Sequence, residues 1–258
     1  MNTPLLRLVF ILTAGLLGFA VAQSASQKHP PNGPIRVLIV TGIDHPAHKW
    51  QETTPAIQGL LGKDQRLKVE VLDDPYRLES ADLGQYQVVL LHFQNWQKAG
   101  PGEAAREKLQ RFVENGGGLV SVHFGCGAWH GEWPEFEKIV GRVWHGVGPG
   151  KTQHDKRGKF LVEIVDKAHA ITKGLEDFET EDELYTCLTG DAPIHLLAQA
   201  QSNVDQKHHS MAFVREYGKG RVFLTTLGHD VTAYTNNPAV GELIRRGTAW
   251  AASSKPAP

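Results

Sequence analysis

Hydrophobic residues along the chain form short apolar runs that alternate with stretches of helical spacing. The apolar runs predict buried strands at 35–40, 87–92 and 119–123, and alternation predicts a more exposed strand at 67–72. Helical spacing predicts helices at 48–61, 102–114, 133–140 and 237–251. Further strands are expected at 160–165, 194–199, 210–214 and 221–226. Because strands and helices alternate, we expect one α/β domain, a three-layer sandwich with a mostly parallel central sheet.

Proline and glycine set two of the predicted helix boundaries. Pro55 falls inside the segment 48–61 and predicts that this helix begins or bends there. Asn115 and the three glycines that follow it predict the end of the helix 102–114.

The N-terminus has the pattern of a secretory signal peptide. Arg7 precedes an apolar run, and Ala20-Val21-Ala22 forms a cleavage site before Gln23. The competing interpretation is a membrane anchor, but the run is short for a spanning helix and contains a threonine and two glycines. We therefore expect an exported protein, periplasmic or secreted. The predicted signal peptide, disordered leader, folded domain and disordered tail occupy 1–22, 23–34, 35–252 and 253–258.

Charge and motif content exclude several classes of partner. The chain has 27 Lys and Arg against 28 Asp and Glu, so no basic excess favours nucleic acid. No polybasic block favours a membrane surface after signal cleavage. No glycine-rich phosphate loop opens a helix, so we expect no nucleotide cofactor. The oligomeric state stays open, a homo-oligomer included.

Histidines gather at one edge of the predicted sheet. The chain has 13 His in 258 residues, yet His45, His92, His123 and His229 all stand at or just past the end of a predicted strand. In open α/β sheets, ligands bind beyond the carboxyl ends of the strands. A single histidine there can simply cap a loop, but the set predicts a functional site.

Two kinds of chemistry fit these histidines. In the first, His123, His229 and Glu183 act as general acid and base. In the second, His123, His145 and His229 bind a divalent transition metal such as zinc, manganese or nickel, and Glu183 or Asp230 could complete the site as a carboxylate ligand.

Tryptophans between His92 and His145 favour a small carbohydrate ligand. Aromatic faces stack on sugar rings, although large rings also fill protein cores. Polar groups nearby would bind the hydroxyls. The expected substrate-binding residues are Asp44, His45, His92, Trp96, Trp129, His130, Trp133, Tyr185 and Asp230.

The two cysteines allow three interpretations. Cys126 follows a strand in a context similar to a nucleophile elbow, although the local order Gly-Cys-Gly displaces it from the expected apex. In an exported protein, Cys126 and Cys187 could instead form a disulfide. Free buried thiols are the third interpretation.

Several segments resemble the ThuA-like (trehalose utilisation) family. The matching segments are Gly116–His123, Trp133–Gly141, His169–Leu175, Asp182–Tyr185 and Tyr217–Asp230. The resemblance implies a class I glutamine-amidotransferase-like fold of the flavodoxin-like kind. It also implies histidine in place of that superfamily's cysteine nucleophile, which matches His123.

The resemblance further implies a role in sugar metabolism, including keto glycosides. We therefore expect acid–base or metal-assisted isomerisation or cleavage of a keto sugar. Two alternatives are a non-catalytic carbohydrate-binding module and a thiol-dependent amidotransferase-like enzyme that uses Cys126.

Overall fold

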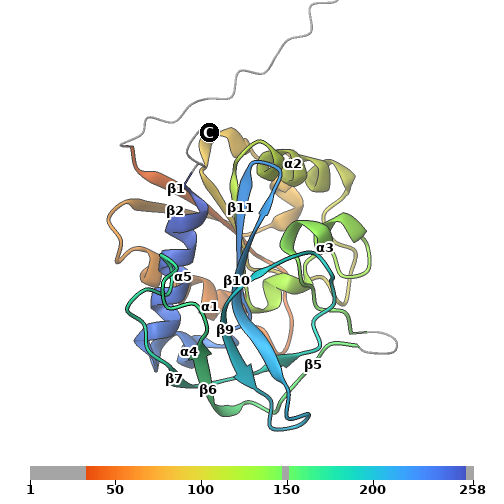
Figure 1. Ribbon diagram of the computed structural model, residues 1–258. Coiled ribbons are helices and arrows are strands. Elements are labelled where there is room, and N and C mark those ends of the chain that lie inside the picture. The colour runs from red at the N-terminus through yellow and green to blue at the C-terminus, as the bar shows by residue number, and fades with distance from the viewer. Residues whose placement is uncertain (1–32, 147–150, 254–258) are drawn as a thin grey trace, which may run out of the picture.

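The computed structural model describes residues 33–146 and 151–253 (Figure 1). The predicted signal peptide, the leader up to residue 32 and the tail from residue 254 lie outside these ranges. Within them, no helix combines the length and apolar character needed to cross a membrane.

Nine strands form the central sheet, in the order β2-β1-β3-β4-β11-β10-β9-β6-β7. The first five in this order pair in parallel: β2 (Leu67–Leu72), β1 (Ile35–Val40), β3 (Val88–Leu91), β4 (Gly118–Val122) and β11 (Gly220–Thr225). The others pair antiparallel: β10 (His208–Tyr217), β9 (His195–Gln201), β6 (Gly158–Ile164) and β7 (Phe178–Asp182). Since each antiparallel pairing reverses direction, β9 and β7 point the same way as the parallel strands. The end of β7 therefore lies at the same sheet edge as the ends of β4 and β11.

Helices cover both faces of the sheet, which confirms the predicted α/β class and large central sheet (Figure 1). One face carries α1 (Trp50–Leu61), α4 (Val231–Thr235) and α5 (Pro238–Ala251). The other carries α2 (Glu103–Glu114) and α3 (Pro134–Val140). Each face has its own apolar core, built for example from Ile57 and Leu243 on the first and from Leu109 and Ile139 on the second.

Most predicted elements are present, and the exceptions have local causes. Helix α1 begins at Trp50, and Pro55 lies inside it at the cost of one backbone hydrogen bond. Strand β7 was not predicted because its inward positions, Thr180 and Asp182, are polar. Short elements also escaped prediction: α4, the 3-10 helices Pro75–Glu79, Leu83–Gln85 and His123–Gly127, and the two-residue strands β5 (Gln153–His154) and β8 (Tyr185–Thr186).

Candidate functional site

His123 stands at the turn where β4 ends and the 3-10 helix η3 (His123–Gly127) begins. Its φ of 47° lies in the left-handed region, which is costly for a residue with a Cβ. The turn presses against β3, since a Cβ on Gly125 would lie 2.3 Å from the carbonyl oxygen of Leu91. The sequence thus places a buried imidazole, and not a thiol, at the apex of this turn.

Hydrogen bonds fix which nitrogen of His123 faces the site. Nδ1 lies 2.6 Å from the carbonyl oxygen of Thr226, which only accepts, so Nδ1 carries the proton. Nε2 then presents a lone pair, to which the Tyr185 hydroxyl donates over 2.8 Å. Burial, followed by the neighbouring His48 and His229, holds the pKa of His123 well below its ordinary value. His123 is therefore a neutral imidazole.

His48, in the loop between β1 and α1, lies against His123 and His229. Its ring centroid is 5.4 Å from that of His123 and 5.1 Å from that of His229. Burial lowers its pKa to about 2, with a further contribution from His229. Among the described residues, its Nδ1 has no hydrogen-bond partner. Sequence reasoning chose His45 in this loop and missed His48, although the same rule of looking beyond strand ends covers both.

Glu183 and His229 form a close carboxylate–imidazole pair next to these imidazoles. Glu183 Oε2 lies 3.0 Å from His229 Nδ1 and 3.8 Å from His123 Nε2. Burial lowers the pKa of His229, but the contact with Glu183 and the charges of Asp182 and Asp230 together more than offset it, and the pKa lies above its ordinary value. His229 therefore carries a proton more readily than a free histidine.

Asp182, at the end of β7, ties the Glu183 and His229 loops together. Its carboxylate accepts hydrogen bonds from the backbone N–H groups of Gly228 at 2.6 Å, His229 at 3.0 Å and Glu183 at 2.8 Å. Burial raises its pKa to about 6, in spite of these three donors. Sequence reasoning missed Asp182, because an acid inside a strand gives no signal of such a role.

The four side chains converge. One ligand atom from each of His48, His123, Glu183 and His229 lies within 4.8 Å of all the others. This histidine–glutamate cluster can donate and accept protons, and its donor atoms suit a transition-metal ion.

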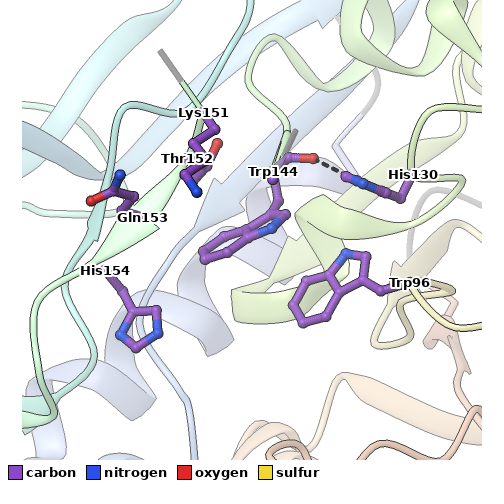
Figure 2. Close-up of a pocket in the computed structure, with 8 residues that line it drawn as sticks. Trp96, His130, Trp144, Lys151, Thr152, Gln153 and His154 are labelled. Atoms are coloured by element: carbon purple, nitrogen blue, oxygen red, sulfur yellow. Dashed lines mark hydrogen bonds between the residues drawn. The ribbon is translucent and has the colours of Figure 1, made fainter. Parts of the chain in front are cut away.

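An open cleft of about 620 Å³ lies next to the cluster (Figure 2). The Trp96 and Trp144 rings lie side by side in it, with centroids 5.3 Å apart. Trp96 also contacts the His48 ring, and Trp144 contacts the Tyr185 ring. His154, a further residue missed from sequence, lines the cleft and places Nδ1 3.7 Å from Glu183 Oε1. The cleft and the cluster therefore share a border.

Other predicted site residues lie apart from the cluster. The buried His92 pairs its Nε2 with the Thr53 hydroxyl at 2.8 Å. Asp230 caps α4 and forms an ion pair with Arg157. Asp44 is exposed and accepts hydrogen bonds from two side chains of α1.

The remaining predicted aromatic residues divide between core and rim. Trp129 is buried, donates from Nε1 to the Pro101 carbonyl and packs against Trp133. His130 lines the cleft and donates from Nδ1 to the Trp144 carbonyl (Figure 2). His45 packs against His48 and Trp96, whereas the exposed His145 stands outside the cluster.

The cysteines are free, with Cys126 buried and Cys187 exposed. Burial raises the pKa of the Cys126 thiol to about 12. Because the thiolate is the nucleophilic form, this environment does not suit a thiol nucleophile.

Comparisons with known proteins agree on the family. The family model described as trehalose utilisation (ThuA) matches residues 36–251. A ThuA-like protein from Parabacteroides merdae ATCC 43184 is 26% identical, with a TM-score of 0.74 over 87% of this chain and 93% of that one. A ThuA-like protein from Bacteroides uniformis ATCC 8492 has 18% identity and a TM-score of 0.67, over 87% and 94%.

A more distant match is a glutamine amidotransferase from Thermotoga maritima. It is 13% identical, with a TM-score of 0.47 over 85% of this chain and 99% of that one, and we draw no conclusion about activity from it. No curated protein matches the sequence.

Proposed function

Because the chain belongs to the trehalose-utilisation (ThuA) family, we propose that it converts a keto-sugar derivative by acid–base isomerisation or cleavage. The family membership agrees with the resemblance found in the sequence. The reaction is assigned to the histidine–glutamate cluster, with the sugar in the adjoining cleft.

The observation that carries the proposal is the Glu183–His229 pair beside neutral His123. The two partners lie 3.0 Å apart, and the pKa of His229 is raised. Proton transfer next to a ketone requires a base and an acid, and this pair supplies both side by side.

The reaction follows from these groups. The Glu183 carboxylate removes the proton from the carbon next to the ketone, and the electron pair moves to the carbonyl oxygen. The His229 imidazolium stabilises the resulting enolate. In a keto sugar the deprotonated carbon carries a hydroxyl, so protonation of the enolate oxygen gives an enediol. That hydroxyl then loses its proton and becomes the new ketone, while the former carbonyl carbon takes a proton, which gives an isomer. Alternatively, the enolate electrons return and expel an oxygen from the β-carbon, which leaves with a proton and cleaves the sugar derivative.

The cleft supports a carbohydrate ligand. Trp96 and Trp144 provide aromatic faces, and Thr152, Gln153 and His154 provide polar groups around them. An apolar face with polar neighbours matches the two kinds of surface on a sugar ring.

The test is turnover of a panel of keto glycosides by Glu183→Gln and His229→Ala variants. Loss of a general acid or base lowers kcat by about 10²–10⁴-fold. The control is His145→Ala, since His145 is exposed and outside the cluster. Unchanged kcat in both cluster variants, on every substrate that the parent converts, would contradict the proposal.

The second candidate is a carbohydrate-binding module, which the paired tryptophans of the cleft favour. In that case Trp144→Ala weakens sugar binding, Glu183→Gln leaves it intact, and no keto sugar is turned over. Calorimetry with the same panel separates the two functions.

A further inference from the structure

We propose that His48, His123, His229 and Glu183 bind one divalent transition-metal ion. The choice of ligands goes beyond the proposed reaction and does not depend on the substrate. It replaces His145, expected as a ligand from sequence, with His48 and adds a carboxylate.

The spacing of the donor atoms fits one ion. Imidazole and carboxylate ligands stand about 2.0–2.2 Å from zinc, so ligands of a tetrahedral site lie about 3.3–3.6 Å from one another. Glu183 Oε2 is 3.0 Å from His229 Nδ1 and 3.8 Å from His123 Nε2, and these two distances lie on either side of that range. All four donors lie within 4.8 Å of one another, so small side-chain rotations bring them to one centre.

The hydrogen bonds that orient the proposed ligand residues are of the kind found around metal-binding histidines. Such a histidine usually donates its second ring N–H to a carbonyl or carboxylate, which orients the metal-binding nitrogen. His123 does this through Nδ1 to the Thr226 carbonyl. Asp182 holds the backbone of both Glu183 and His229 and so fixes two further donors.

His48 provides an independent observation. Its side chain is only 4% exposed, yet Nδ1 finds no hydrogen-bond partner among the described residues. Unpartnered buried polar atoms are rare in folded proteins. Its Nε2 lies 3.5 Å from the Tyr185 hydroxyl, which also contacts His123 Nε2, so one ring nitrogen of His48 stands next to the cluster and the other is unpartnered.

The site is open on one side. The Glu183 and His229 side chains keep 14% and 13% of their surface exposed, whereas His48 and His123 are buried. With four protein ligands, a substrate oxygen that enters from this open side would bind as a fifth ligand, an expansion that catalytic zinc sites undergo. Three imidazoles with one carboxylate suit zinc or nickel, and not calcium or magnesium.

The ion would change the roles of its neighbours. A bound ion would supply the positive charge that the His229 proton supplies without it, and Glu183 would then serve as a ligand and not as the base. The protonatable groups that border the ligands are Tyr185, whose hydroxyl lies 2.8 Å from His123 Nε2, and His154, whose Nδ1 lies 3.7 Å from Glu183 Oε1.

The test measures metal binding without substrate. The full chain, purified without a histidine tag and stripped with a chelator, is titrated with Co²⁺ and followed by visible absorption. Zn²⁺ affinity is then obtained by competition, and bound metal is counted by mass spectrometry. The variants are His48→Ala and Glu183→Gln, with His145→Ala as the matched control and thermal melting as the check on folding.

We expect one ion per parent chain and the same affinity in His145→Ala. Substitution of residues that hydrogen-bond to metal ligands weakens metal affinity by about 10–100-fold. Loss of a ligand itself, in His48→Ala or Glu183→Gln, should weaken the affinity at least as much. Glu183→Gln keeps the shape of the side chain and remains informative if His48→Ala does not fold. Absence of binding by the parent chain, or equal affinity in folded variants of His48 and Glu183, would overturn the proposal. Because turnover is not measured, failure here leaves the proposed reaction standing.

Discussion

At the scale of the residue, Asp182 is the group that holds the candidate site in shape. Its carboxylate accepts hydrogen bonds from three backbone N–H groups in two loops, and its side chain is fully buried. Asp182→Asn places an amide NH₂ against these donors. We expect a loss of about 1–3 kcal/mol in the free energy of unfolding, measured by urea denaturation. The control is Glu179→Gln on the same strand, whose side chain is 64% exposed and whose ion pair is worth little. Equal stability of the two variants would refute this role.

The two thiols should differ in reactivity. Cys187 is exposed, whereas Cys126 is buried and has a pKa raised to about 12. At pH 8 we expect iodoacetamide to label Cys187 alone in the folded protein, and both cysteines in urea. Mass spectrometry counts the labels, and Cys187→Ser should remain unlabelled when folded. Rapid labelling of Cys126 in the native state would restore the thiol-enzyme alternative.

At the scale of the element, sequence pattern predicted strands with apolar inward positions and missed those without. The run Ile35–Val40 is a strand as expected, since it fills a buried position in a parallel sheet. Strand β7 buries Thr180 and Asp182 and so gave no apolar signal. For this reason Glu183 was chosen from its local sequence alone. His48 was missed because helical spacing assigned it to the start of the predicted helix 48–61, whereas α1 begins at Trp50 and leaves His48 in the loop after β1.

Helix α5 should be sensitive to glycine substitution where it crosses the sheet. A Cβ on Gly247 would lie 2.2 Å from the Phe223 ring, so Gly247→Ala should destabilise the protein by about 1–3 kcal/mol. Gly59, on the exposed side of α1, has nothing within 4 Å of such a Cβ. Gly59→Ala should stabilise the protein by about 0.4–1 kcal/mol, because alanine favours the helix. Thermal melting compares the two variants. A melting temperature of Gly247→Ala at or above that of Gly59→Ala would contradict the packing of α5.

At the scale of the whole molecule, export remains a proposal from sequence. We expect that expression of the full chain in a bacterium yields a mature form that begins at Gln23, because the residues before it match a cleavage site. N-terminal sequencing of the exported fraction checks this. Ala22→Asp removes the small residue required at the site and should leave the precursor uncleaved. A parent chain recovered intact in the cytoplasm would contradict export.

The candidate site draws on residues from 48 to 229, and Glu183 directly follows β7, an edge strand of the nine-stranded sheet. No shorter fragment contains all four side chains, so the site is absent until nearly the whole sheet has closed. Contacts so distant in sequence form late in folding. A chain exported before it folds would cross the membrane without this site. The composition of the outer compartment, and not that of the cytoplasm, would then decide which ion and which sugar the protein first encounters.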